Sequence, residues 1–395
     1  MSPRGAALLT PTFLLTCCAT FAFFVSFYIL LPTIPLYAVS LGGTEGQVGL
    51  VIGLLTLSST LCRPCVAPAI DRRRRKPFMV IGAVIFVLSG LLYPLATTIP
   101  RLLLLRVFHG SGMGIFMTAA MALVTDVAPR PRRGEAMGAY GLAINLAMAI
   151  APAAGMAVVN AASFPALFLV STGVAAVALL LAVSVPEGVP AFRAAEAARD
   201  PGHIISRAAL FPSAIMMAQT ITYGVVLSFV PIWGRANGME NPGLFFTLYA
   251  AALLAVRTRA GKLSDRFGRG AVVVPGLGIV SAAMVVLALA GGPRQILAAG
   301  VVFGTGMGAV QPSLAAFLTD RAPEAERARA FATFYGSFEL GVGVGSIGLG
   351  WFLEATSFPA MWMVAAVVAA LGAGGFMVGA RAPRGNGPRP AGPGE

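Results

Sequence analysis

The chain has 395 residues, of which 57% are apolar and only 11% are charged, and its mean hydropathy is +0.83. Soluble domains average about 25% charged residues, so this composition excludes a soluble globular protein, and its hydrophobicity also excludes intrinsic disorder. A net charge of +13 would suit a nucleic-acid-binding protein, but the Lys and Arg residues stand in short groups between apolar runs. That placement is typical of a polytopic membrane protein whose basic residues stay on the cytoplasmic side.

Apolar runs long enough to cross a bilayer divide the chain into twelve segments. Because the backbone of such a run can satisfy its own hydrogen bonds in lipid as a helix, we predict an all-α fold of twelve transmembrane helices. The predicted spans are 10–39, 46–69, 77–98, 102–126, 134–159, 163–185, 208–233, 242–260, 271–290, 295–320, 328–354 and 358–380.

The spans form two groups of six on either side of a polar segment. We expect an N-terminal six-helix bundle over 1–185, a cytoplasmic central loop over 186–207, a C-terminal six-helix bundle over 208–380 and a disordered cytoplasmic tail over 381–395. The first apolar run is too long for a cleavable signal peptide. With both termini in the cytoplasm, 24 of the 28 Lys and Arg residues lie on the cytoplasmic side, and this asymmetry predicts the topology.

An internal repeat relates the two groups of spans. At a shift of 194 positions, many charged residues and glycines of the first half align with identical residues of the second, and a shift of 195 aligns Tyr140 with Tyr335. The pairs at 194 include Arg63 with Arg257, Asp71 with Asp265, Arg72 with Arg266, Gly110 with Gly304, Gly112 with Gly306, Gly114 with Gly308 and Asp126 with Asp320. Two parallel six-span repeats are an architecture of secondary transporters.

A charged motif follows the second span of each half. It reads Gly261-Lys-Leu-Ser-Asp265-Arg266-Phe-Gly268-Arg269 in the second half, and the first-half copy has Ala67 in place of the first Gly. This motif resembles the G-x-L-x-D-R-x-G-R loop signature of the major facilitator superfamily. The resemblance implies a charge cluster that latches one conformation, joined by an acid at the end of span four; plain topogenic charge is the alternative. The predicted latch comprises Asp71, Arg72, Arg75, Asp126, Asp265, Arg266, Arg269 and Asp320.

Two more motifs fit the resemblance. Arg106-Val-Phe-His109-Gly-Ser-Gly in span four is similar to the family's R-x-x-Q-G-x-G pattern of proton-coupled members, with His in place of Gln. An Arg inside a span is a functional candidate, although Arg106 is near enough to the outer edge to snorkel. His109 is either a core residue or a proton carrier, since imidazole titrates near neutral pH. In span five, Ala151-Pro152-Ala-Ala-Gly155-Met156 partly resembles the antiporter signature G-P-x-x-G-G.

Glu339 is the one of the 15 acids that falls near the middle of a predicted span. A lone carboxylate in hydrocarbon is costly, so we expect Glu339 to bind a proton, or to pair with a cationic substrate or with Arg106. Its repeat equivalents, Asn145 at a shift of 194 and Ile144 at 195, carry no charge. The predicted proton-coupling residues are Glu339, His109 and Arg106; a protonated structural glutamate is the alternative.

These features predict a transporter and not an enzyme. With only two histidines, the sequence indicates no catalytic site and no metal site. It contains no G-x-x-x-x-G-K-[ST] sequence, so it indicates no ATP site. We therefore expect no cofactor, and we expect a proton gradient to be the energy source.

The resemblance favours a monomeric antiporter of the bacterial inner membrane that exports a small amphiphilic or neutral molecule. Its expected partners are that substrate, protons and lipid, without nucleic acid. Proton-coupled uptake of a nutrient is the main alternative, and a scaffold or receptor the remote one. The candidate substrate-cavity residues are Tyr28, Asn145, Gln219, Tyr223, Gln311 and Tyr335.

Overall fold

The computed structural model describes residues 9–72, 74–186, 206–323 and 326–380, apart from the side chains of Asp71, Arg130 and Ala328. Over these ranges the regular structure is helical. The long helices are α1 (Pro11–Tyr28), α2 (Thr33–Ser40), α3 (Glu45–Arg72), α4 (Arg75–Leu92), α5 (Ile99–Val127), α6 (Arg133–Ala161), α7 (Phe164–Ser184), α8 (Arg207–Ala236), α9 (Gly243–Phe267), α10 (Gly270–Ala288), α11 (Pro293–Arg321), α12 (Arg327–Glu354) and α13 (Phe358–Gly379). Short 3₁₀ turns, η2 (Tyr93–Leu95) and η3 (Arg130–Arg132), follow α4 and α5. Nearly all of the predicted central loop and the whole predicted tail lie outside the described residues.

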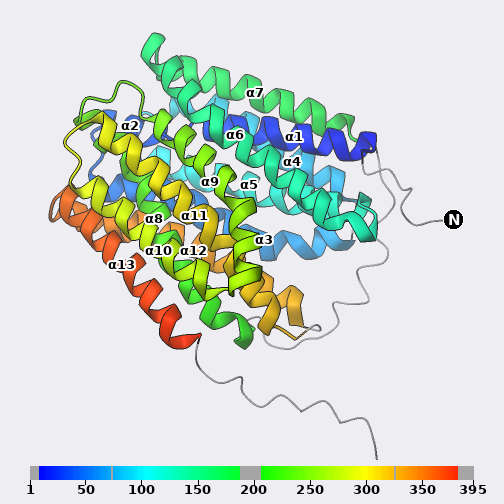
Figure 1. Ribbon diagram of the computed structural model, residues 1–395. Helices are drawn as coiled ribbons and strands as arrows, with labels where there is room; N and C mark the ends of the chain where they lie inside the picture. The colour runs from blue at the N-terminus through cyan, green and yellow to red at the C-terminus, as the bar shows by residue number, and fades with distance from the viewer. Residues whose placement is uncertain (1–8, 73, 187–205, 324–325, 381–395) are drawn as a thin grey trace, which may run out of the picture.

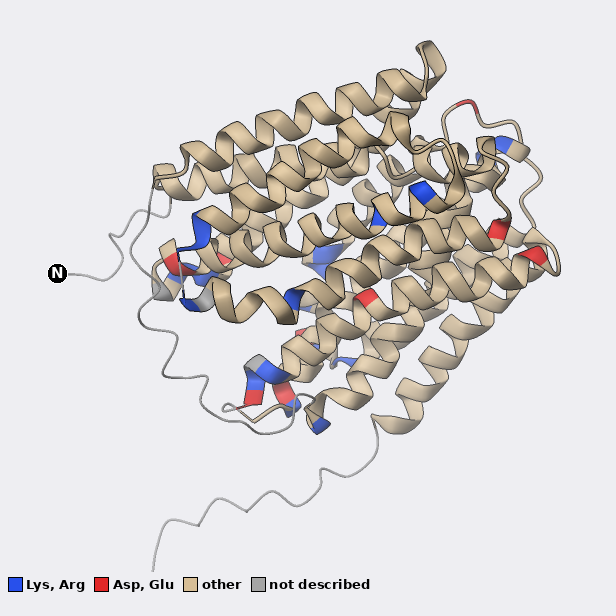
Figure 2. Cartoon of the chain, turned by 180° about the vertical axis from the view of Figure 1, so that it is seen from behind, with Lys and Arg blue, Asp and Glu red and all other residues tan. Residues whose placement is uncertain are grey.

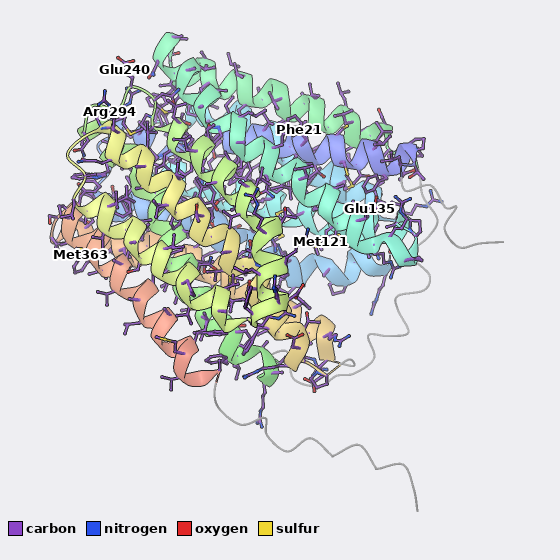
Figure 3. The ribbon with its side chains drawn as sticks, in the orientation of Figure 1. Phe21, Met121, Glu135, Glu240, Arg294 and Met363 are labelled. Carbon is purple, nitrogen blue, oxygen red and sulfur yellow. The ribbon has the colours of Figure 1, made fainter. Side chains whose placement is uncertain are left out.

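The fold confirms the expected all-α polytopic class. Within the described residues, eleven helical segments are long and apolar enough to cross a bilayer, and α12 is a further 28-residue helix that contains Glu339. Apolar side chains such as Val378 (76% exposed) cover the outer surface, where lipid would solvate them. Met121 and Met363 are two of these outward side chains (Figure 3). Charged residues gather mainly at the ends of the helices (Figure 2).

The predicted first span, 10–39, is confirmed as one candidate span, Pro11–Ser40, but it is not a single helix. It is divided into α1 and α2 by residues 29–32, where Leu31 and Pro32 form turns. Proline lacks the N–H that continues a helix and clashes with the preceding turn, so Pro32 explains the interruption. The break lies beside Tyr28, the last residue of α1.

Equivalent sequences begin equivalent helices. Ser163-Phe-Pro-Ala precedes and starts α7, and Ser357-Phe-Pro-Ala does the same for α13, 194 positions later. Each serine hydroxyl accepts a hydrogen bond from the backbone N–H three residues on, at 3.3 Å and 3.4 Å. Such N-caps satisfy an N–H that the helix cannot, and Pro in the first turn has no N–H to lose.

The helices pack as two similar halves, α1–α7 and α8–α13. Helix α5 packs on α3 and α4, and correspondingly α11 packs on α9 and α10. The halves meet where α3 packs on α12 and where α6 packs on α9, which are themselves equivalent contacts under the repeat. Figure 1 shows the N-terminal half in blue to green-cyan above the C-terminal half in green to red.

Repeat-related glycines set the spacing within each half. A Cβ at Gly114 would lie 2.6 Å from the carbonyl oxygen of Ser59, and a Cβ at Gly308 would lie 2.6 Å from that of Leu253. Ser59 and Leu253 are also 194 positions apart. Small residues permit this close helix approach in membranes, so the aligned glycines keep α5 on α3 and α11 on α9.

The two ends of the bundle differ. We call the end with the α3–α4 and α9–α10 connections the basic end, and the opposite one, with Glu240 and Arg294, the far end (Figure 3). Glu135, at the start of α6, lies at the basic end. The halves come together at the far end, whereas their basic ends diverge (Figure 1).

Candidate functional site

Hydrogen bonds join the two halves at the far end. The Asn160 side chain donates to the Glu240 carbonyl at 2.7 Å, and the Asn241 side chain donates to the Ala153 carbonyl at 3.0 Å. On the other side of the interface, the Glu354 carboxylate accepts from the Gly46 N–H at 3.2 Å. These contacts close the far end in this conformation.

Glycines allow α3 and α12 to pack closely from the far end toward the middle of the bundle. Gly49 faces the backbone of Ser346, and a Cβ at Gly343 would lie 3.0 Å from the Leu57 side chain. Because the glycines have no side chains, α3 and α12 approach closely, and the next polar residues of α3 come within reach of α12. The residues so placed are Thr60 and Arg63.

Glu339 of α12 forms an ion pair with Arg63 of α3 and accepts a hydrogen bond from the Thr60 hydroxyl. The side chain of Glu339 is 13% exposed and that of Arg63 is 28% exposed. Both carboxylate oxygens are therefore held by the opposite half of the protein. The expectation that Arg106 would oppose Glu339 is wrong, because the cation at that position is Arg63.

Arg63 retains unused hydrogen-bonding capacity. One of its terminal nitrogens contacts both Glu339 and the Met117 sulfur, the latter at 3.5 Å. Its Nε is buried and has no hydrogen-bond partner among the described residues. The phenol of Tyr140, on α6, is near enough to interact electrostatically with Arg63. A buried donor without an acceptor is costly, which marks Arg63 as a group that can accept a further ligand.

Arg257 is the repeat equivalent of Arg63, but its surroundings differ. Its side chain is exposed, and among the described residues no ion pair to it is found. It interacts electrostatically with the phenols of Tyr249 and Tyr335. Tyr335 lies four residues before Glu339 on α12, hence on the same helix face, so Arg257 belongs to the same region. We call Thr60, Arg63, Arg257, Tyr335 and Glu339 the inter-half site.

Aromatic rings from both halves adjoin the inter-half site. The Tyr223 ring lies 5.8 Å from that of Tyr249 and 6.1 Å from that of Phe338, which precedes Glu339. Tyr28 of the N-terminal half interacts electrostatically with Tyr223. The centroid of the Tyr28 ring lies 5.2 Å from that of the Phe27 ring. The structure thus brings three of the sequence candidates, Tyr28, Tyr223 and Tyr335, to the region around Glu339.

The other cavity candidates have different surroundings. Gln219 is fully buried, and its amide nitrogen contacts the Met307 sulfur at 3.2 Å. The Asn145 amide donates to the Gly141 carbonyl of its own helix at 2.8 Å. Gln311 is half-buried on α11. Of these, Asn145 lies on an interface helix, α6, whereas Gln219 is enclosed within the C-terminal half.

Arg106 and His109 share one partner inside the N-terminal half. Arg106 donates to the Tyr93 hydroxyl at 3.2 Å and to the Val51 carbonyl at 2.8 Å. The Tyr93 oxygen lies 2.8 Å from Nδ1 of His109. Since Arg106 can only donate, the hydroxyl proton is free to point at His109. All three side chains are buried, and the network ties η2, α3 and α5 together.

The predicted latch residues form ion pairs within each half. Nε of Arg75 lies 3.1 Å from Asp126, and Nε of Arg269 lies 2.9 Å from Asp320. Arg269 also pairs with Asp265. Hydrogen bonds to Asp320 and Asp265 raise the pKa of the Arg269 guanidinium above its ordinary value.

The remaining latch candidates are peripheral or undescribed. Arg72 is exposed at the end of α3, and the Arg266 guanidinium stacks 5.2 Å from the Phe267 ring. The side chain of Asp71 lies outside the description. In this conformation the described latch pairs link α4 to α5 and α10 to α11.

The chain also matches a known protein family. The family model described as Major Facilitator Superfamily matches residues 16–256 and 213–394. The chain belongs to the major facilitator superfamily. The staphylopine export protein of Staphylococcus aureus is 24% identical over 363 residues, covering 87% of this chain and 90% of that protein.

Solved structures of two transporters have the same fold. The crystal structure of the nucleoside transporter NupG matches with a TM-score of 0.74 at 14% identity, covering 94% of this chain and 100% of that chain. A bacterial homolog of the human lysosomal transporter Spinster, described as inward-facing and unoccupied, matches with a TM-score of 0.74 at 16% identity, covering 94% and 96%. This superfamily member is therefore a multi-pass membrane transporter, as the sequence motifs predicted.

Several residues of the site were missed by sequence reasoning. The repeat pairs Arg63 with Arg257, but the sequence assigns both to the cytoplasmic charge, and it gives no functional prediction for Thr60 or Tyr93. The sequence feature that could have identified Arg63 as a functional residue is its position inside predicted span 46–69. An arginine so deep in a span needs a partner or an aqueous face. Nothing in the sequence indicated that this partner lies on α12.

Proposed function

We propose that this transporter couples proton movement to export of a small molecule by alternating access, with Glu339 as the proton-binding group. The observation that supports this proposal is the Arg63–Glu339 ion pair. It lies at mid-span, and it joins the two halves that must move relative to each other. Protonation of Glu339 would remove the negative charge that holds Arg63.

The orientation follows from the distribution of basic residues. We place the basic end in the cytoplasm of a bacterial cell and both chain ends on that side, because cytoplasmic loops carry the excess of Lys and Arg. The conformation described above is then open toward the cytoplasm and closed on the outside. The far-end contacts of Asn160 and Glu354 would separate in the opposite conformation.

The proposed cycle uses the ion pair as a switch. With Glu339 ionised, the substrate enters from the cytoplasmic side, and the loaded protein opens outward. A proton from outside then binds Glu339, and the protonated carrier returns. Because the Arg63–Glu339 pair joins the two halves, the empty carrier would return only after a proton has neutralised Glu339 and released Arg63. This requirement would couple the proton to the substrate.

Export is the proposed direction because a relative that aligns with most of the chain is named an export protein. The Arg106–Tyr93–His109 network is proposed as a support of the N-terminal half that positions α3 beside α12. It meets its hydrogen-bonding needs within that half. Proton exchange at His109 would make the network a second coupling element.

Transport by everted membrane vesicles tests the proposal. A panel of labelled compounds is offered to vesicles containing the wild type, Glu339→Gln or Glu339→Asp, with and without a proton gradient. We expect uphill accumulation by the wild type, strong loss in Glu339→Gln, and partial retention in Glu339→Asp, which keeps a titratable carboxylate. Wild-type accumulation and pH dependence in a correctly inserted Glu339→Gln protein would overturn the assignment of Glu339.

A further inference from the structure

The charges of the inter-half site are unbalanced. Two guanidinium groups, Arg63 and Arg257, stand against one carboxylate, Glu339. The repeat explains the imbalance: each half contributes an equivalent arginine and an equivalent tyrosine, Tyr140 or Tyr335, but only the C-terminal half contributes an acid. At the repeat equivalent of Glu339, the N-terminal half has Ile144 or Asn145 instead.

Both arginines can bind an additional anion. Arg63 has a buried Nε–H without a partner even while it pairs with Glu339. Arg257 is exposed at mid-span, and no ion pair to it is found in the described part of the chain. An arginine in the middle of a span is not expected to face lipid. Its electrostatic neighbours, Tyr249 and Tyr335, place it beside the aromatic rings and near the face of α12 that carries Tyr335 and Glu339.

The sign of the substrate charge decides how it is linked to the proton. A simple organic anion would bind best after protonation of Glu339 had released Arg63, so anion and proton would travel together. A simple organic cation would compete with the proton at Glu339 but would meet two arginines there. A zwitterion can replace both partners of the ion pair, its ammonium binding Glu339 and its carboxylate binding Arg63. Its ammonium needs an ionised Glu339, so the zwitterion and the proton exclude each other.

We propose that the inter-half site binds an amino-acid-like zwitterion, with the ammonium on Glu339 and Thr60 and the carboxylate on Arg63. Arg257, with Tyr335, holds a second carboxylate where the substrate has one. This inference rests on the proposed proton exchange, because a zwitterion is the class whose binding competes with the proton while satisfying the excess positive charge. The rings of Tyr223, Tyr249 and Phe338 would pack against the organic part of the molecule.

Three compounds with the same phenyl ring test the charge requirement. Phenylalanine carries both charged groups, 3-phenylpropanoate only the carboxylate, and phenethylamine only the ammonium. Binding to the purified full-length transporter is measured by calorimetry from mildly acidic to mildly alkaline pH. We expect phenylalanine to bind at least about tenfold more tightly than either analogue, with its affinity falling as protons compete for Glu339. Tighter binding of 3-phenylpropanoate, tighter binding of phenethylamine, or no binding of phenylalanine at millimolar concentration overturns the inference.

Matched variants assign the groups. Glu339→Gln should remove the preference for phenylalanine over 3-phenylpropanoate, since the ammonium loses its partner while Arg63 remains. Arg257→Gln should weaken the binding of N-(carboxymethyl)phenylalanine, which has a second carboxylate, about tenfold more than it weakens the binding of phenylalanine. Equal losses for the two ligands would overturn the role of Arg257. An unchanged ligand preference in Glu339→Gln would overturn the ammonium site.

A ligand-free measurement keeps the two proposals distinguishable. Trp351 lies against Gly46 in the α3–α12 contact, so its fluorescence reports on that interface when the other two tryptophans are replaced, as Trp233→Phe and Trp362→Phe, in every protein compared. If Glu339 is the proton-binding group, wild-type fluorescence changes with pH and that of Glu339→Gln does not. A Glu339-dependent change without phenylalanine binding defeats the zwitterion and leaves proton coupling standing. No Glu339-dependent change defeats the proton site itself.

Discussion

Nε of Arg269, the residue that precedes α10, lies 2.9 Å from the Asp320 carboxylate of α11, and Arg75 and Asp126 repeat this pairing at 3.1 Å, 194 positions earlier. The second contact of each arginine is also repeated. Arg75 donates to the Ile70 carbonyl, and Arg269 donates to the Ser264 hydroxyl, at equivalent positions of α3 and α9. The repeat therefore extends from sequence to the geometry of individual charged groups. Both pairs connect the ends of three neighbouring helices within a half.

Removing either latch acid should slow transport more than it destabilises the protein. Asp126→Asn and Asp320→Asn each abolish an ion pair whose acid is 41% or 50% exposed, and exposed pairs stabilise by about 0.2–1 kcal/mol. We expect a severalfold lower rate with nearly unchanged melting temperature, measured in vesicles and by thermal unfolding. Glu135→Gln, which breaks the exposed pair with Arg132 outside the motif, is the control and should transport normally. Normal rates in both latch variants would contradict the role of the pairs.

Tyr93→Phe should destabilise the N-terminal half. The change removes the hydroxyl that both Arg106 and His109 contact, and each buried polar group left without a partner costs about 1–3 kcal/mol. The melting temperature in detergent measures the loss. Tyr37→Phe is the matched control, because the buried Tyr37 hydroxyl makes one hydrogen bond, to the Ala96 carbonyl at 3.2 Å. The control substitution should lower the melting temperature less. Equal effects of the two substitutions would count against a shared network.

Gly308→Ala should separate α11 from α9. The added Cβ would lie 2.6 Å from the Leu253 carbonyl oxygen, and overpacking of this kind costs about 1–3 kcal/mol. Gly114→Ala should have a similar effect in the first half, because its distance to Ser59 is the same. Gly348→Ala, on α12, has no atom within 4 Å of the added Cβ and should be neutral. Thermal unfolding of the three variants checks the prediction; a neutral Gly308→Ala would show that these helices can move apart freely.

Gly243→Ala should favour the conformation that is open at the far end. Its Cβ would meet the backbone of Pro152 and lie 2.6 Å from the nitrogen of Ala153 on α6, so the closed far end would be strained. Disulfide crosslinking between Asn160→Cys and Glu240→Cys, in a background without the four native cysteines, should fall severalfold. Gly141→Ala on α6 meets no atom within 4 Å and serves as the control. Undiminished crosslinking in Gly243→Ala would show that the far end does not open this way.

Helix positions were largely predictable from the sequence, because lipid imposes length and polarity on each span. Predicted spans 134–159 and 358–380 correspond closely to α6 and α13. The predicted end of span 242–260 was too early, since α9 continues to Phe267 and includes Asp265. Hydropathy detects the part of a helix in lipid, whereas its polar end continues into the interface on backbone hydrogen bonds alone.

The site was less predictable, because its key contact joins residues 276 positions apart in sequence. Glu339 could be recognised alone, since a mid-span acid is costly wherever it points. Its partner could not, because Arg63 and Arg106 both lie within spans of the N-terminal half, and only the packing of α3 on α12 distinguishes them. The sequence also does not tell which end of the bundle is closed. The closed end differs between the two conformations of a transporter, and one sequence must encode both conformations.

The lone acid of the inter-half site has a consequence for the energetics of the cycle. On the proposed mechanism, one carboxylate serves both halves, so each turnover carries one proton inward against one substrate molecule outward. Exchange for a zwitterion of zero net charge would then be electrogenic. Each 100 mV of membrane voltage would add about 2.3 kcal/mol, which is about fiftyfold in the concentration ratio that the transporter can sustain. Voltage would thus drive export even when the internal and external pH are equal.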